Sequence, residues 1–107
     1  MKVLKDYRGR AIRLTGERLR HVLEHPEMAG LEPAIGEALA RPELVVRSLA
    51  DENATLNYLY MRGTSFGDKW LCVVVKYGQY GQQVDGFVLT AYLTDKPKKG
   101  EQLWPAK

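Results

Sequence analysis

The most constraining feature of the sequence is a nearly continuous apolar run, Trp70–Tyr77, which reads Trp-Leu-Cys-Val-Val-Val-Lys-Tyr. A run of this length predicts a central β-strand that is covered on both faces. A polar, glycine-containing turn is expected over Gly78–Gln83, and a second apolar strand over Val84–Leu93. Because so short a connection joins antiparallel neighbours, these two strands are expected to pair with each other.

Two further strands are expected before this run. Glu43–Leu49 contains the apolar triplet Leu-Val-Val, and Thr55–Met61 alternates between its two faces. The cluster Asp51-Glu52-Asn53 predicts the turn between them. The glycine-containing segment Arg62–Asp68 is expected to be a loop. Because neighbouring strands end close together in the sequence, we expect an antiparallel meander.

The N-terminal part is expected to hold a β-hairpin and two helices. Val3–Tyr7 and Ala11–Leu14 are the predicted strands, joined by a turn that contains a glycine. Thr15 is a suitable N-cap for the first helix, and Pro26 ends it. The second helix is expected over Pro33–Ala40, with proline in its first turn.

The predicted fold class is therefore α+β, with the N-terminal β-hairpin and two helices packed on a roughly four-stranded antiparallel sheet. The length of 107 residues is typical of one domain. We expect residues 1–107 to form that domain, with residues 95–107 as an irregular basic tail. The sheet face away from the helices is half polar and is a candidate binding surface.

Charge is unevenly distributed along the chain, although the net charge is only +3. Residues 1–20 carry 7 − 2 = +5, residues 21–68 carry 3 − 8 = −5, and residues 69–107 carry 6 − 3 = +3. Basic ends of this kind can present a positive face to a phosphate backbone. Ordinary solvated charges explain the same numbers, and for so small an excess they are the simpler interpretation.

The expected location is the cytoplasm. The single cysteine, Cys72, lies inside the apolar run, which fits a buried core residue in a reducing compartment. No apolar run approaches the roughly 18 residues of a membrane span. The start, Met1–Asp6, lacks the apolar core of a signal peptide. We therefore expect no membrane association.

Both histidines, His21 and His25, lie four residues apart on the first predicted helix, away from its apolar stripe. Two such histidines can bind one metal ion, but zinc requires a third and often a fourth ligand. The chain has no further histidine, and Cys72 is expected to be buried. We therefore expect no metal site and no cofactor.

A metal-free acid–base arrangement remains, and RNA cleavage needs little more. A base takes the proton of the 2′-hydroxyl, an acid protonates the leaving oxygen, and cations stabilise the charged intermediate. Histidine suits the first two roles because its pKa lies near neutrality. The candidate catalytic residues are His21, His25, Arg47 and Thr90, and the candidate substrate-binding residues are Lys76, Tyr58, Tyr60 and Tyr92. Tyrosines can stack on bases.

Each candidate also has a purely structural interpretation. His21 fits an exposed helix residue, and His25 fits a residue that caps the helix C-terminus. Arg47 and Lys76 fit charges at strand ends. The tyrosines of the alternating strand fit core positions, and Thr90 is an ordinary strand residue.

Several short motifs occur in a recognisable order over most of the chain. They are Gly9-Arg10-x-Ile12-x-Leu14-Thr15, His21-Val22-x-x-His25-Pro26-Glu27, Ala38-Leu39-x-x-Pro42-Glu43, Val73-Val74-Val75, Thr90-Ala91-Tyr92, Lys99-Gly100 and Leu103-Trp104. Together they resemble the phage-associated branch of the barnase–EndoU–colicin–RelE-like nuclease superfamily. The His-Pro-Glu element and the Thr-Ala-Tyr strand are the most specific parts of this resemblance.

The resemblance implies a helical N-terminal part on a four-stranded antiparallel sheet, with metal-independent RNA cleavage as the ancestral activity. It implies active residues at His21, His25, Arg47 and Thr90. One departure is Leu19, where the family pattern has tryptophan two residues before the first histidine. A shared fold hosts many functions, so membership does not by itself imply activity.

Two functional hypotheses follow. The first is a small ribonuclease, toxin-like or phage-related, whose partners are RNA and a protein antidote. The second is a non-catalytic module that binds RNA or a protein on the same fold. The first requires the imidazoles, Arg47 and Thr90 to converge on one cleft.

Overall fold

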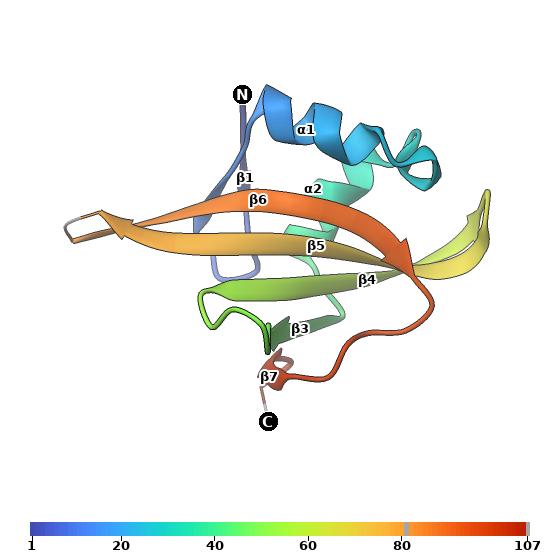
Figure 1. Ribbon diagram of the computed structural model, residues 1–107. Coiled ribbons are helices and arrows are strands. Elements are labelled where there is room, and N and C mark those ends of the chain that lie inside the picture. The colour runs from blue at the N-terminus through green and yellow to red at the C-terminus, as the bar shows by residue number, and fades with distance from the viewer. Residues whose placement is uncertain (81, 107) are drawn as a thin grey trace.

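The computed structural model describes residues 1–80 and 82–106, which form two helices, one short 3₁₀ helix and seven strands (Figure 1). The elements are β1 (Lys2–Lys5), β2 (Ala11–Leu14), α1 (Gly16–Leu23), η1 (Pro26–Met28), α2 (Glu32–Ala40), β3 (Leu44–Arg47), β4 (Ala54–Thr64), β5 (Gly67–Tyr80), β6 (Gln83–Thr94) and β7 (Glu101–Trp104). The predicted α+β class is confirmed.

The strands form one sheet in the order β1-β2-β6-β5-β4-β3-β7. The predicted central strand is confirmed, because β5 lies between β4 and β6 with antiparallel pairing on both sides. The predicted number of about four strands is wrong. The N-terminal hairpin joins the sheet through a parallel pairing of β2 with β6, and β7 adds a further strand beside β3.

The β2–β6 pairing depends on a glycine. A Cβ atom placed on Gly86 would lie 2.7 Å from the Cδ1 atom of Ile12 and 3.1 Å from the Tyr77 ring. Gly86 is paired with Ile12 in the parallel ladder. The missing side chain therefore lets the hairpin approach β6 while the Tyr77 ring packs beneath it.

The prediction of an irregular tail over residues 95–107 is also wrong in part, because β7 lies within it. This strand pairs with β3 in an antiparallel register that is interrupted by an irregularity between Val45 and Val46. A Cβ atom on Gly100 would lie 2.4 Å from the carbonyl oxygen of Arg47. So close a backbone approach is possible only for glycine, and it sets β7 against the sheet.

Two predicted connections are shorter than expected. β4 and β5 extend into the predicted loop Arg62–Asp68, where Gly63 and Gly67 have φ values of 67° and 93°. β5 and β6 likewise extend into the predicted turn Gly78–Gln83, of which residue 81 lies outside the described part of the chain. Hydrogen bonds between the paired backbones continue along both hairpins whatever the polarity of the side chains, so polar segments that were expected to be loops are parts of strands.

The helix termini agree with the local signals. The Thr15 hydroxyl accepts a hydrogen bond from the backbone N–H of Arg18 at 3.1 Å, and α1 begins at the next residue, Gly16. Pro26 starts η1 rather than continuing α1. In α1 only Val22 is buried. Helical spacing predicts that Leu19, Val22 and Leu23 share one apolar face, but Leu23 is 41% exposed.

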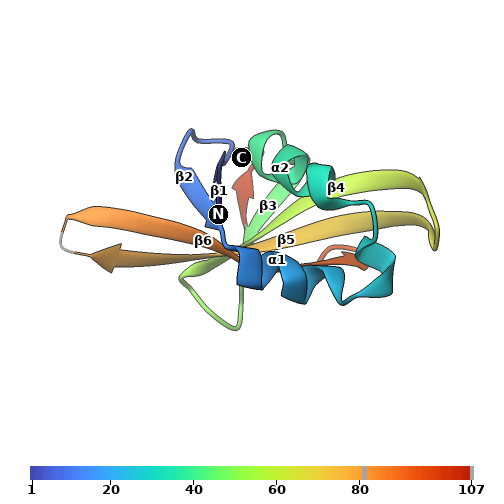
Figure 2. The same cartoon turned by 90° about the horizontal axis from the view of Figure 1, so that it is seen from above.

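The sheet is curled around a core on its helix side. α2 packs against β1, β4 and β5 and lies between the hairpin and β4, while α1 packs along β6 (Figure 2). The helix-side core contains Ile12, Leu14, Val22, Met28, Ile35, Ala38, Leu39, Leu71, Val73, Val75, Val88 and Ala91. The outer face carries a second cluster of Val46, Ala54, Leu56, Tyr58, Cys72 and Val74.

None of the helices within the described residues combines the length and the apolar composition that spanning a bilayer requires.

Candidate functional site

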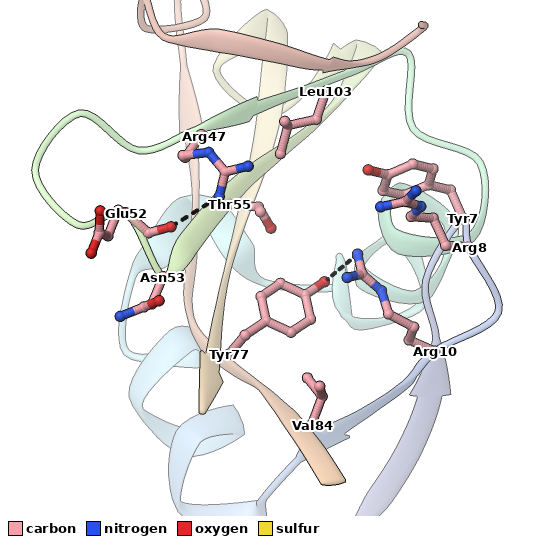
Figure 3. A pocket seen from close by; sticks show the side chains of 10 residues that line it. All are labelled: Tyr7, Arg8, Arg10, Arg47, Glu52, Asn53, Thr55, Tyr77, Val84 and Leu103. Atoms are coloured by element: carbon pink, nitrogen blue, oxygen red, sulfur yellow. Dashed lines mark hydrogen bonds between the residues drawn. The ribbon is translucent and has the colours of Figure 1, made fainter. Parts of the chain in front are cut away.

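A hollow of about 200 Å³ lies between the β1–β2 turn and strands β3, β4 and β5 (Figure 3). We call it the basic hollow. It is lined by Tyr7, Arg8, Arg10, Arg47, Glu52, Asn53, Thr55, Tyr77, Val84 and Leu103. These residues come from the β1–β2 turn, the turn before β4, and strands β3, β4, β5, β6 and β7. The lining contains three arginines and one glutamate, and two of the arginines, Arg10 and Arg47, form ion pairs with the carboxylates of Asp6 and Glu101, which lie outside the lining.

The hairpin turn is anchored by Asp6, whose side chain is fully buried. One carboxylate oxygen accepts the backbone N–H groups of Arg8 and Arg10, both at 2.9 Å. The other accepts Nε of Arg10 at 2.7 Å and the hydroxyl of Tyr77 at 2.9 Å. A buried carboxylate with four donors is well satisfied and fixes the turn relative to β5.

Tyr77 lines the hollow from β5, and its ring lies between Asn53 and Arg10 (Figure 3). Its hydroxyl oxygen accepts a hydrogen bond from Arg10 at 3.1 Å, and the Arg10 guanidinium carbon lies 4.5 Å from the centre of its ring. Burial raises the pKa of Tyr77, the Arg10 charge opposes that shift, and the Asp6 carboxylate adds to it. Tyr77 is therefore a neutral hydrogen-bonding group at ordinary pH.

The other two arginines differ in how they are held. Nε of Arg47 donates to the Glu101 carboxylate at 2.9 Å, and a terminal nitrogen donates to the carbonyl oxygen of Glu52 at 3.1 Å. The Glu52 carboxylate itself is turned away from the hollow (Figure 3). Arg8 is exposed, and its guanidinium has no ion-pair or hydrogen-bond partner among the described residues. Arg8 is therefore the cation most available to a ligand.

The histidines lie elsewhere. Their rings meet edge to face with centroids 5.9 Å apart, with His21 exposed and His25 half-buried. Nδ1 of His25 lies 3.9 Å from the carboxylate of Glu27, which lines a surface hollow with Leu93 and Thr94 at the end of β6. The basic hollow instead contains Val84, near the start of β6.

The two hollows reach opposite ends of β6, because Val84 lines the basic hollow and Thr94 lines the hollow beside Glu27. Val84 and Thr94 are 94 − 84 = 10 positions apart on this strand, a length of roughly 30 Å at the usual rise per residue. One phosphate cannot contact groups so far apart. The histidine pair and Arg47 therefore form two separate sites rather than one cleft.

Thr90 lies on the outer face of the sheet. It pairs with Val74, which belongs to the outer cluster, and residues directly opposite each other share one face of a sheet. Lys76 is paired with Ala54 of the same cluster and forms an ion pair with Asp51. Both therefore lie on the opposite side of the sheet from α1.

The candidate tyrosines also lie on the outer face. Tyr58 is fully buried, and its hydroxyl accepts the backbone N–H of Lys98 at 3.0 Å, so its ring is not accessible for base stacking. Tyr60 and Tyr92 are half-buried, and the Tyr60 ring lies 5.1 Å from that of Trp70. Burial raises the pKa of Tyr58 to about 12 and also raises the pKa of Tyr92.

Most of the residues that line the basic hollow were not singled out from the sequence. The turn Arg8-Gly9-Arg10 carries the only local signal, two arginines on either side of a glycine that has φ 79°. Arg47, one of the predicted catalytic residues, does line the hollow. Tyr77 carries no local signal, because its position depends on the pairing of β5 with β6.

Within the described residues, no group of three or more histidine, cysteine, aspartate or glutamate side chains is arranged to hold a metal ion. Comparison of the chain with protein-family models, curated proteins and solved structures found no match.

Proposed function

We propose that this protein binds RNA and that the basic hollow holds the phosphate backbone. The observation that carries the proposal is the convergence of Arg8, Arg10 and Arg47 from two segments of the chain on one concave surface. Arginine presents several N–H donors in a planar fork that fits phosphate oxygens. Phosphate contacts of this kind supply most of the affinity in sequence-independent binding.

The chemistry of the hollow favours binding over cleavage. A general base must lie within about 3 Å of the proton that it removes. Among the described residues no imidazole lines the hollow, and Tyr77 keeps its proton because its pKa is raised. Glu52 turns its carboxylate outward (Figure 3). The lining supplies cations and neutral hydroxyl groups, which can hold a phosphate without activating a 2′-hydroxyl.

A metal-independent ribonuclease is the second candidate function, and the imidazole pair is the observation that favours it. His21 and His25 are close enough for one to act as base and the other as acid on a strand that crosses α1. The exposed Arg20 is the neighbouring cation on that helix. In this case a protein antidote would have to cover α1 rather than the basic hollow.

RNA binding is tested by fluorescence anisotropy with a labelled single-stranded RNA over a range of salt concentrations. We expect Arg8→Ala to weaken binding and to reduce the slope of log affinity against log salt by about 0.7, the value for one lost phosphate contact. Arg62→Ala is the matched control, because Arg62 lies at the far end of β4 from the hollow. Equal binding by both variants and the wild type would refute the proposal.

Cleavage is tested on the same RNA in EDTA, followed on denaturing gels. A ribonuclease that uses the histidines would cut the RNA as wild type and lose activity as His21→Ala or His25→Ala. Intact RNA at every wild-type concentration, or equal cleavage by all three proteins, would remove the second candidate.

A further inference from the structure

We infer that Tyr7 and Trp104 form a stacking site for an unpaired nucleobase, so that the RNA bound by this protein is single-stranded. We call these two rings the aromatic platform. The inference rests on the proposed RNA binding and extends it, because it names the class of RNA.

The rings of the platform lie with their centroids 5.4 Å apart and their planes inclined by 43°. Trp104 is 41% exposed, although it is one of the largest apolar side chains of the protein. A tryptophan that is half open to solvent offers a large, rigid aromatic surface to a ligand. The platform borders a second hollow of about 450 Å³, which is lined by Tyr7, Arg8, Gln102, Leu103, Trp104 and Ala106.

This second hollow adjoins the basic hollow. Tyr7, Arg8 and Leu103 line both. A nucleotide carries a negative phosphate and a flat base, and the two adjoining hollows offer arginines for the first and aromatic rings for the second. Arg8, whose guanidinium has no partner within the described part of the chain, lies at the boundary, where it can contact a phosphate beside a stacked base.

The platform selects for single strands because stacking requires a free base face. In a duplex each base is covered above and below by its neighbours, and only unpaired nucleotides present a face to an aromatic side chain. Combinations of a basic groove with aromatic platforms are typical of proteins that bind single strands. The alternative is that Tyr7 and Trp104 only join the two edges of the sheet, and the experiment separates the two.

The test compares two labelled probes of equal length and charge: an eight-nucleotide oligoadenylate and the corresponding abasic ribose-phosphate oligomer. We expect Trp104→Leu to weaken oligoadenylate binding about 5- to 150-fold, the loss that corresponds to one stacked base at about 1–3 kcal/mol. Binding of the abasic probe should be unchanged, which also shows that the variant is folded. Trp104→Tyr, which keeps an aromatic ring, should retain most of the affinity.

A second readout uses the tryptophan itself. The protein has two tryptophans, so Trp70→Phe leaves Trp104 as the sole indole fluorophore. Oligoadenylate should quench its emission, and the abasic probe should not.

Three outcomes would overturn the inference, and they differ from one another. If Trp104→Leu weakens both probes equally, the platform is only a structural clamp. If the variant binds both as the wild type does while Arg8→Ala weakens them, the phosphate site stands and the base site is refuted. If the wild type binds neither probe, the proposed function itself fails.

Discussion

The rings of Tyr7 and Trp104 meet at 5.4 Å although the residues stand 104 − 7 = 97 positions apart in the chain. Tyr7 follows β1 and Trp104 ends β7, and these are the two edge strands of the sheet. Their contact shows that the sheet curls until its edges approach each other. The basic hollow lies inside this curl, so its shape depends on the position of β7.

Gly100→Ala should displace β7 and open the curl. The added Cβ atom would lie 2.4 Å from the backbone oxygen of Arg47, which cannot move aside as a side chain would. We expect the free energy of unfolding to fall by about 1–3 kcal/mol, as is usual for overpacking. In a Trp70→Phe background, the emission of Trp104 should shift to the red as the contact with Tyr7 loosens.

Gly16→Ala is the control for this variant, because a Cβ atom on Gly16 meets nothing within 4 Å. Urea titration should show the control to be at least as stable as the wild type, since alanine favours a helix more than glycine does. Equal stability of the two alanine variants would contradict the close packing of β7 on β3.

Asp6→Ala should destabilise the hairpin turn. The substitution removes the acceptor of four hydrogen bonds and leaves Arg10 and the Tyr77 hydroxyl without their partner. We expect the free energy of unfolding to fall by about 3 kcal/mol. This value is at the lower end of the range for breaking a buried ion pair, because Arg10 is partly exposed. Glu37→Ala breaks an exposed pair with Arg41 and should leave the urea midpoint unchanged, and a similar effect of both variants would refute this role of Asp6.

Stability should fall in alkali, and Tyr58 should carry part of that loss. Its pKa is about 12 in the folded protein and about 10 when unfolded. Between these values the unfolded state binds fewer protons, so the stabilising contribution is complete below pH 10 and declines as the pH rises toward 12. Unfolding free energies at pH 9 and pH 11 should therefore differ less in Tyr58→Phe than in the wild type.

At pH 9 the same variant should be less stable by about 1 kcal/mol, because the backbone N–H of Lys98 loses its hydrogen bond to the Tyr58 hydroxyl. An identical loss of stability between pH 9 and pH 11 in both proteins would contradict the assignment of alkaline sensitivity to Tyr58.

The helices were the most predictable part of the fold. The cap at Thr15 and the proline at position 26 act on the backbone next to them, so their effect can be read without knowing the tertiary structure. The central strand β5 was equally predictable, because a run of apolar residues must be covered on both sides.

The edge strands were not predictable in the same way. β7 has no apolar alternation of its own, and it forms because Gly100 lets it approach β3. The parallel pairing of β2 with β6 likewise depends on Gly86. Nothing in the neighbouring sequence distinguishes this strand glycine from a glycine in a turn. Strand pairing at the edge of a sheet depends on two segments, and the pairing cannot be predicted from the sequence of either segment alone.

The sequence by itself determined the α+β class, the capped first helix and the central strand, because short-range sterics and apolar periodicity decide them. Only the tertiary structure decided which cations share a site. It brings Arg8 and Arg10 together with Arg47, and it leaves His25 beside Glu27, whose hollow lies at the other end of β6. The physical reason is the curl of the sheet, which is set by packing between strands far apart in the chain, and which also brings Tyr7 to Trp104.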